Sequence, residues 1–141
     1  MPLRSGKHGS SHIISIKTAW GEGAIKSIFP LLQKAKTVKI ACFTFSSYYL
    51  LKHTNNTAEV EVYASNIAVK ELVRATFYKV KNLHAKVILI DDHAVIGSAN
   101  QTYGGLHGNI EFMIITDNKE VVEDVKRFFE HLRRRSSLVS G

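Results

Sequence analysis

The segment LHAKVILIDDHAVIGSAN, residues 83–100, restricts the fold of this chain more than any other stretch. It contains two apolar runs, 83–90 and 94–98, which are joined by the turn-forming residues DDHA. Short apolar runs bounded by turn residues are typical of buried strands. The segment therefore predicts two strands that lie next to each other inside a sheet.

Strand-like and helix-like patterns alternate along the rest of the chain. Apolar runs and apolar-polar alternation predict strands at 12–20, 37–45, 58–65 and 109–116. Helical spacing of apolar residues predicts helices at 23–36, 66–77 and 117–134, and the residues YYLLKH predict a short helical turn. This alternation predicts an α/β fold, with a mixed β-sheet covered by helices on both faces.

Local signals within the predicted helices mark where they begin or break. Pro30 should kink or restart the first helix, because proline cannot donate the helical hydrogen bond. Asn66 and Asp117 are candidate N-caps of the later helices. In the last helix acidic residues lie early and basic residues late, as the helix dipole favours.

The length of the chain predicts one domain over residues 1–141. We expect its core at about residues 12–132, with basic polar tails at 1–11 and 133–141. No apolar stretch approaches the roughly 18 residues of a membrane-spanning helix, and the start lacks the apolar segment of a secretory signal. These features predict a cytoplasmic protein without stable membrane insertion.

The composition bounds the partners and the redox chemistry. Lys and Arg number 19 against 12 Asp and Glu, a net charge of +7 that suits a polyanion such as nucleic acid. An anionic lipid surface would suit this charge too, and the basic residues at the two ends are equally consistent with simple solvation. Cys42 is the single cysteine, so no internal disulfide forms, and its apolar neighbours predict a buried thiol.

His84 and Lys86 stand out because two basic side chains enter an apolar run. Alternate side chains of a strand share a face, so we expect His84 and Lys86 to point the same way. Lysine supplies a positive charge for a phosphate, and the histidine ring can attack phosphorus as a nucleophile. Gly97, Ser98 and Asn100 follow on the next strand and can hold phosphate oxygens.

This run resembles the HKD motif of the phospholipase D superfamily, in which His-x-Lys is followed by Asp, Gly-Ser and Asn. His84, Lys86, Asp91, Gly97, Ser98 and Asn100 occupy those places. Only five residues, 92–96, separate Asp91 from Gly97, one fewer than in the usual pattern, so Asp92 is a second candidate for the aspartate's role. The resemblance extends to Glu111 in the strand after the motif and covers residues 12–132.

The resemblance implies a phosphodiesterase whose reaction centre needs two such motifs, one histidine acting as nucleophile and the other as acid and base. With one motif, the chain is similar to small bacterial nucleases that take the second copy from an identical subunit. It thus implies a homodimer with one composite site, a phosphohistidine intermediate, and neither metal nor cofactor. Nucleic acid, DNA or RNA, is the implied substrate of an endonuclease.

The resemblance also implies a role for each motif residue. Lys86 and Asn100, assisted by Ser98 and Gly97, would bind the non-bridging oxygens of the phosphate. Glu111 would accept a hydrogen bond from the second ring nitrogen of His84, and Asp91 would help to orient that network.

Other interpretations remain open from the sequence. The enzyme could act on a phospholipid as a phosphodiesterase or phosphatidyl transferase, or the chain could be an inactive nucleic-acid-binding module. Seven histidines without metal-ligand spacing make a zinc site an unfavoured alternative. Tyr48, Tyr49 and Tyr103 are candidates for stacking on bases of a single strand, with core packing as the competing interpretation.

Overall fold

The computed structural model describes residues 15–140, which form an eight-stranded sheet. The strands are β1 (Ile16–Gly21), β2 (Thr37–Phe45), β3 (Glu59–Ile67), β4 (Thr76–Lys79), β5 (Val87–Ile90), β6 (His93–Gly97), β7 (Glu111–Thr116) and β8 (Ser137–Ser140). Their order across the sheet is β1-β7-β6-β5-β2-β3-β4-β8. β2, β3 and β4 run parallel and the other neighbours antiparallel, so the sheet is mixed.

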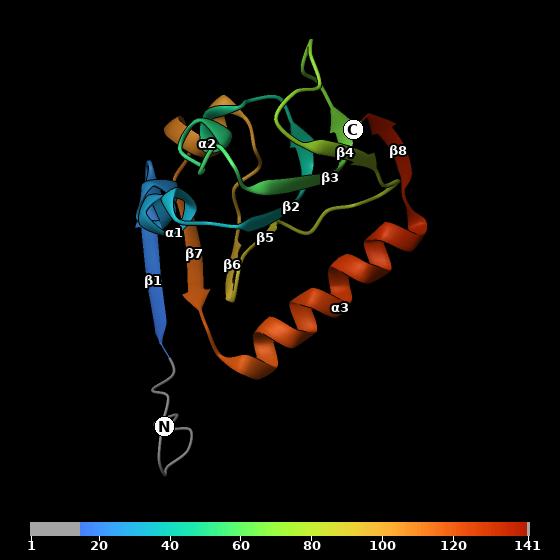
Figure 1. Ribbon diagram of the computed structural model, residues 1–141. Helices are drawn as coiled ribbons and strands as arrows, with labels where there is room; N and C mark the ends of the chain where they lie inside the picture. Colours follow the sequence, from blue (N-terminus) through green and yellow to red (C-terminus); the bar gives the residue numbers. More distant parts are fainter. Residues whose placement is uncertain (1–14, 141) are drawn as a thin grey trace.

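Helices lie on both sides of this sheet. They are the 3-10 helix η1 (Ala24–Ile28), α1 (Phe29–Gln33), α2 (Tyr49–Lys52), the π-helix η2 (Gly104–Gly108) and α3 (Lys119–Arg135). Figure 1 shows α3 crossing one side of the sheet, with α1 and α2 on the other. Among residues 15–140, no helix is both long and apolar enough to cross a membrane.

Each face of the sheet has its own hydrophobic core. The larger core lies under η1, α1, α2 and η2, and includes Ile28, Leu32, Leu50 and Leu106. The smaller core lies under α3 and includes Val122, Val125, Phe129 and Leu132. Because strand side chains alternate between faces, neighbouring residues of one strand supply both cores. The fold class predicted from the sequence is therefore confirmed.

The predicted helix at 66–77 is wrong. β3 continues through Asn66 and Ile67, which pair with Thr44 and Phe45 of the parallel strand β2. Arg74 then adopts a left-handed backbone with φ of 72°, which cannot continue a right-handed helix. Strand pairing with β2 and β3 thus overrides the helical spacing of these apolar residues, and the chain forms β4 instead.

The ends of the predicted elements shift by a few residues. Pro30 lies in the first turn of α1, where the chain restarts after η1, as expected. Asn118, not Asp117, is the N-cap of α3: its Oδ1 accepts from the Val121 N–H at 3.0 Å. Asp117 Oδ1 instead accepts from the Ser15 N–H at 2.7 Å. β1 begins at Ile16, while residues 12–14 of the predicted strand lie outside the described residues.

The C-terminal residues extend the fold where a polar tail was expected. α3 continues to Arg135, and Ser137–Ser140 form β8, which pairs with β4 at the edge of the sheet. The tail expected at residues 1–11 lies outside the described residues.

One part of the sheet on the α3 side is not covered by that helix. The core under α3 draws on β2 to β6, whereas β1 and β7 at the sheet edge contribute nothing to it. Large apolar side chains are exposed there, and the register places them on one face: Ile16, Trp20, Ile96, Phe112 and Ile114. We call these five residues the apolar sheet face. Exposed apolar groups in such a cluster are typical of an interaction surface.

Candidate active site

His84 and Lys86 lie in the segment that leads into β5, which begins at Val87 and is shorter than the predicted strand. The lead-in is fixed at both ends by hydrogen bonds. The Leu83 N–H donates to Ser65 Oγ of β3 at 2.7 Å, and the Gly97 N–H of β6 donates to the Lys86 carbonyl oxygen at 3.2 Å. Two neighbouring strands therefore hold the histidine and the lysine in place.

The side chains of His84 and Lys86 lie at the surface of this hydrogen-bonded segment. The Lys86 ammonium donates to the His84 carbonyl oxygen at 3.0 Å. The imidazole of His84 is exposed and lies against the ring of Phe43, with 4.8 Å between ring centroids. An exposed imidazole supported on one side by an aromatic ring is accessible to a substrate on its other side.

Asn100 is oriented by the backbone at the end of β2. Its Oδ1 accepts from the N–H of Phe43 at 3.0 Å and of Thr44 at 3.3 Å. With its oxygen turned toward β2, the amide NH₂ group is turned away and can donate to an anion. Phe43 thus contacts both motif residues: its ring lies against the His84 ring, and its backbone N–H donates to Asn100.

Ser98 and Glu111 form a polar pair between β6 and β7. The Ser98 hydroxyl donates to Glu111 Oε1 and accepts from the Phe112 N–H at 3.2 Å. Glu111 is only 9% exposed, so its carboxylate depends on this partner. The sequence predicted that Glu111 would accept from His84, whereas the hydrogen-bond donor that the described residues bring to it is Ser98.

Asp91 does not join the other motif residues. It follows β5, whereas His84 precedes β5, so the two lie at opposite ends of the strand. Asp91 Oδ1 accepts from the backbone N–H of Lys36 and of Thr37, each at 3.0 Å. With φ of 50°, Asp91 forms the turn into β6 and fastens it to the start of β2. At this position Asp91 cannot orient the histidine network. The alternative candidate, the exposed Asp92, lies at the same turn, and its carboxylate is 3.8 Å from the Lys126 ammonium of α3.

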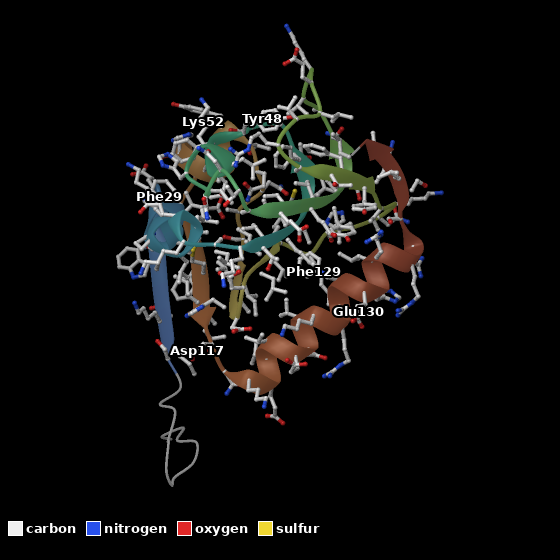
Figure 2. The ribbon with its side chains drawn as sticks, viewed as in Figure 1. Phe29, Tyr48, Lys52, Asp117, Phe129 and Glu130 are labelled. Atoms are coloured by element: carbon white, nitrogen blue, oxygen red, sulfur yellow. The ribbon has the colours of Figure 1, made fainter. Side chains whose placement is uncertain are left out.

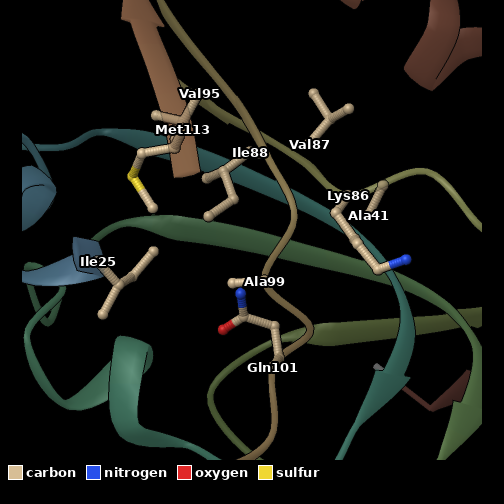
Figure 3. A pocket seen from close by; sticks show the side chains of 10 residues that line it. Ile25, Ala41, Lys86, Val87, Ile88, Val95, Ala99, Gln101 and Met113 are labelled. Atoms are coloured by element: carbon tan, nitrogen blue, oxygen red, sulfur yellow. The ribbon is translucent and has the colours of Figure 1, made fainter. Parts of the chain in front are cut away.

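A small cavity lies behind Lys86, and Figure 3 shows the side chains around it. Ile25, Ile88, Val95 and Met113 form its apolar part, while the stem of Lys86 and the amide of Gln101 border the other side. Gln101 is buried, and its Oε1 has no hydrogen-bond partner among the described residues. Lys86 thus rests on a mostly apolar support, which leaves its ammonium directed outward.

Cys42 lies in the core next to this region. Its thiol is buried, as predicted. Burial raises the pKa of the Cys42 thiol to about 12, although a hydrogen bond to the Gln101 backbone and the charge of Lys86 oppose the rise. The thiol is therefore neutral at physiological pH and is part of the packing.

The π-helix η2 packs tightly on Asn100. A methyl group at Gly105 would overlap the Asn100 carbonyl oxygen and lie 2.9 Å from the Asn100 nitrogen. We expect Gly105→Ala to lower the free energy of unfolding by about 1–3 kcal/mol, since overpacking forces the backbone to shift. Urea denaturation measures the change. Gly108→Ala is the matched control in the same helix, because nothing lies within 4 Å of its added methyl group.

Sequence reasoning missed two residues that shape the site, Phe43 and Ser65. Phe43 is an exposed aromatic in a strand whose neighbours are buried, and this break in the pattern was the available signal. Ser65 carries no motif signal, and only the fold reveals that it fixes Leu83. Within residues 15–140, no group of three or more His, Cys, Asp or Glu side chains is arranged to hold a metal ion.

Four of the motif residues lie where the start of β5 meets the end of β6, at one end of these two neighbouring strands. His84, Lys86, Ser98 and Asn100 come from the start of β5 and the exit of β6. An imidazole, an ammonium and an amide NH₂ group complement a phosphate diester, whose phosphorus accepts a nucleophile while its oxygens accept hydrogen bonds.

Comparison with known proteins places this arrangement in a family. The profile of the family described as "Cardiolipin synthase, PLD-like domain" matches residues 31–133. A search of curated proteins gave no significant match.

Solved structures share the fold at low sequence identity. NucT from Helicobacter pylori is 18% identical, with a TM-score of 0.67 over 90% of this chain and 100% of that one. Nuc from Salmonella typhimurium, a phospholipase D family member, is 14% identical, with a TM-score of 0.71 over 91% of this chain and 99% of that one. Phosphatidylserine synthase from Haemophilus influenzae Rd KW20 is 13% identical, with a TM-score of 0.71 over 94% of this chain and 42% of that one.

The profile covers most of the 141 residues, including the whole motif and Glu111. The protein therefore belongs to the family of cardiolipin synthase, phospholipase D-like domains, and has the fold of the phospholipase D superfamily of phosphodiesterases.

Proposed function

We propose that the protein is a metal-independent phosphodiesterase that cleaves nucleic acid through a phosphohistidine intermediate. The observation that carries the proposal is that Phe43 contacts both His84 and Asn100, the first through its ring and the second through its backbone N–H, while the Lys86 ammonium donates to the His84 carbonyl oxygen. These groups supply a nucleophile, a positive charge and an amide donor without a bound cation.

The reaction divides into two displacements at phosphorus. A ring nitrogen of His84 attacks the phosphate, the bond from phosphorus to the leaving oxygen breaks, and a second histidine donates a proton to that oxygen. The second histidine then takes a proton from water, whose oxygen attacks phosphorus and breaks the bond to His84. Lys86 and Asn100 bind the non-bridging oxygens in both steps. The Ser98 hydroxyl donates to Glu111 and the Gly97 N–H donates to the Lys86 carbonyl oxygen, so these two residues support the site and do not donate to the phosphate.

The second histidine is His84 of a second copy of the chain. A two-fold dimer presents the same surface of each copy to the other, so a site near the axis receives both histidines. The apolar sheet face supplies a surface of this kind. It is next to the site, because Phe112 directly follows Glu111 and its N–H donates to Ser98. We therefore assign the apolar sheet face to the dimer interface.

Nucleic acid is the favoured substrate for two reasons. The net charge of +7 attracts a polyanion. The chain also matches Nuc and NucT over nearly their full lengths, whereas it spans less than half of the phosphatidylserine synthase chain. The description of the matching family, which names cardiolipin synthase, keeps phospholipid hydrolysis or transfer as the second candidate function.

Cleavage of labelled single- and double-stranded DNA and RNA in excess EDTA tests the proposal. We expect the wild type to cut at least one of these substrates with the chelator present, and His84→Ala to cut none. Phosphatidylcholine vesicles added as competitor should leave the cleavage unchanged. Cleavage that stops in EDTA would refute the metal-free mechanism, and competition by vesicles would favour the phospholipid reaction. Binding of nucleic acid without cleavage by either protein would favour an inactive binding module.

A further inference from the structure

Five rings on the outer side of η2, α2 and α1 form a continuous series. Successive ring centroids lie 4.6 Å apart from Tyr103 to His107, 4.2 Å from His107 to Tyr49, 5.0 Å from Tyr49 to His53 and 3.9 Å from His53 to Phe29. We call these five residues the ring ladder. Three different helices contribute to it, so sequence periodicity could not reveal it.

The ring ladder begins at the surface and ends against the larger core, on which Phe29 and Tyr49 pack. Tyr103 at its end is 74% exposed, and the other four rings are half-buried. Tyr48, which is not a member, packs edge-on against the core residues Phe45 and Phe77. An aromatic side chain as exposed as Tyr103 leaves a ring face free for another planar group.

The exposed end of the ring ladder is close in the chain to Asn100, one of the proposed phosphate-binding residues. Tyr103 follows Asn100 by three residues, and η2 packs against the Asn100 backbone at Gly105. The chain between them is fixed to the end of β2, because the Gln101 carbonyl oxygen accepts from the Ser46 N–H at 2.8 Å. The π-helix η2, a geometry frequent at functional sites, carries His107 behind Tyr103.

We propose that the ring ladder is a stacking platform for unpaired bases, so that the substrate is single-stranded nucleic acid. The proposal rests on the proposed function: a phosphate held by Lys86 and Asn100 leaves the bases of the neighbouring nucleotides within reach of Tyr103 and His107. Bases stack on aromatic rings without sequence preference, because every base has a planar face. In a duplex these faces are already stacked on neighbouring base pairs, and the ring ladder gives no advantage.

The far end of the ring ladder has positive charge beside it. Lys52 belongs to α2 together with Tyr49, and its side chain is exposed. Figure 2 shows Lys52 and Phe29 on the side of the molecule where α1 and α2 lie. A surface that binds single strands has two components, aromatic rings on which bases stack and positive charge that attracts the phosphates. The ring ladder and Lys52 supply one of each.

Binding to an inactive background tests the proposal separately from catalysis. In His84→Ala protein, the probes are a fluorescent oligothymidylate of about twelve nucleotides, an abasic strand of the same length, and a duplex. We expect the intact strand to bind more tightly than the abasic strand and the duplex. Adding Tyr103→Ala should weaken binding of the intact strand by about 5- to 100-fold and remove its advantage over the abasic strand. Tyr103→Phe, which keeps the ring, should retain that advantage.

The outcomes separate this inference from the proposed function. Equal binding of intact and abasic strands by the parent would refute the platform, and so would a Tyr103→Ala variant that keeps the advantage of the intact strand. If either of these binding results is obtained but cleavage by the wild type still depends on His84, the nuclease proposal is supported and the stacking platform is refuted. If the protein neither binds nor cuts any nucleic acid, both are wrong.

Discussion

His84→Ala is expected to lower the rate of phosphodiester hydrolysis by about four orders of magnitude or more. In the proposed reaction the imidazole forms the bond to phosphorus, and in a two-fold dimer the substitution also removes the proton donor. The remaining groups, Lys86 and Asn100, bind the phosphate but offer no nucleophile. Hydrolysis of a chromogenic bis-aryl phosphodiester in EDTA measures the loss without any demand on macromolecular binding.

His93→Ala is the matched control for this substitution. His93 is the first residue of β6 and pairs with Ile90, the last residue of β5, whereas His84 precedes the start of β5. His93 therefore belongs to the same hairpin but lies at its other end, away from the site. We expect its hydrolysis rate to stay within about two-fold of the wild type, as is usual for surface substitutions away from special features. A His84→Ala protein within ten-fold of the wild type would show that another group is the nucleophile.

The sequence was sufficient to predict the fold class and six of the eight strands in the described part of the chain, because each of these strands has a local pattern, whereas β4 and β8 were not predicted. β2, at Thr37–Phe45, has the predicted limits. The prediction of a helix at 66–77 was wrong because it used only the local spacing of apolar residues. Asn66 and Ile67 pair with a strand more than twenty residues away, and this pairing outweighs the local spacing.

The predictions for the candidate site rest on residue type and motif spacing, which do not say where each side chain lies in the fold. His84 and Lys86 precede β5 and Asn100 follows β6, at the same end of the two strands, whereas Asp91 lies at the opposite end of β5. Its carboxylate caps the start of β2, a role that turn aspartates often have. Likewise, the ring ladder and the apolar sheet face arise from segments that meet only in the folded chain.

If the proposed dimer forms through the apolar sheet face, Trp20→Lys is expected to convert it into monomers and to remove most of the activity. Trp20 is 71% exposed on the edge strand β1 and pairs with Phe112 on the apolar sheet face. Replacing a large aromatic anchor of an interface costs about 2 kcal/mol or more, and in a two-fold dimer the change occurs twice. The dissociation constant should therefore rise about 1,000-fold. Analytical ultracentrifugation measures the assembly, and hydrolysis of the chromogenic phosphodiester measures the activity.

Leu138→Lys separates an interface effect from the effect of a new charge. Leu138 is 65% exposed on β8, the opposite edge strand of the same sheet, so the two substitutions match in exposure and charge. Lysine is well tolerated on edge strands, and both variants should keep the thermal stability of the wild type. Only Trp20→Lys should lose the dimer, and its activity should recover as protein concentration rises, because association restores the second histidine. A monomeric Trp20→Lys protein with full activity would place both catalytic steps within one chain and contradict the composite site.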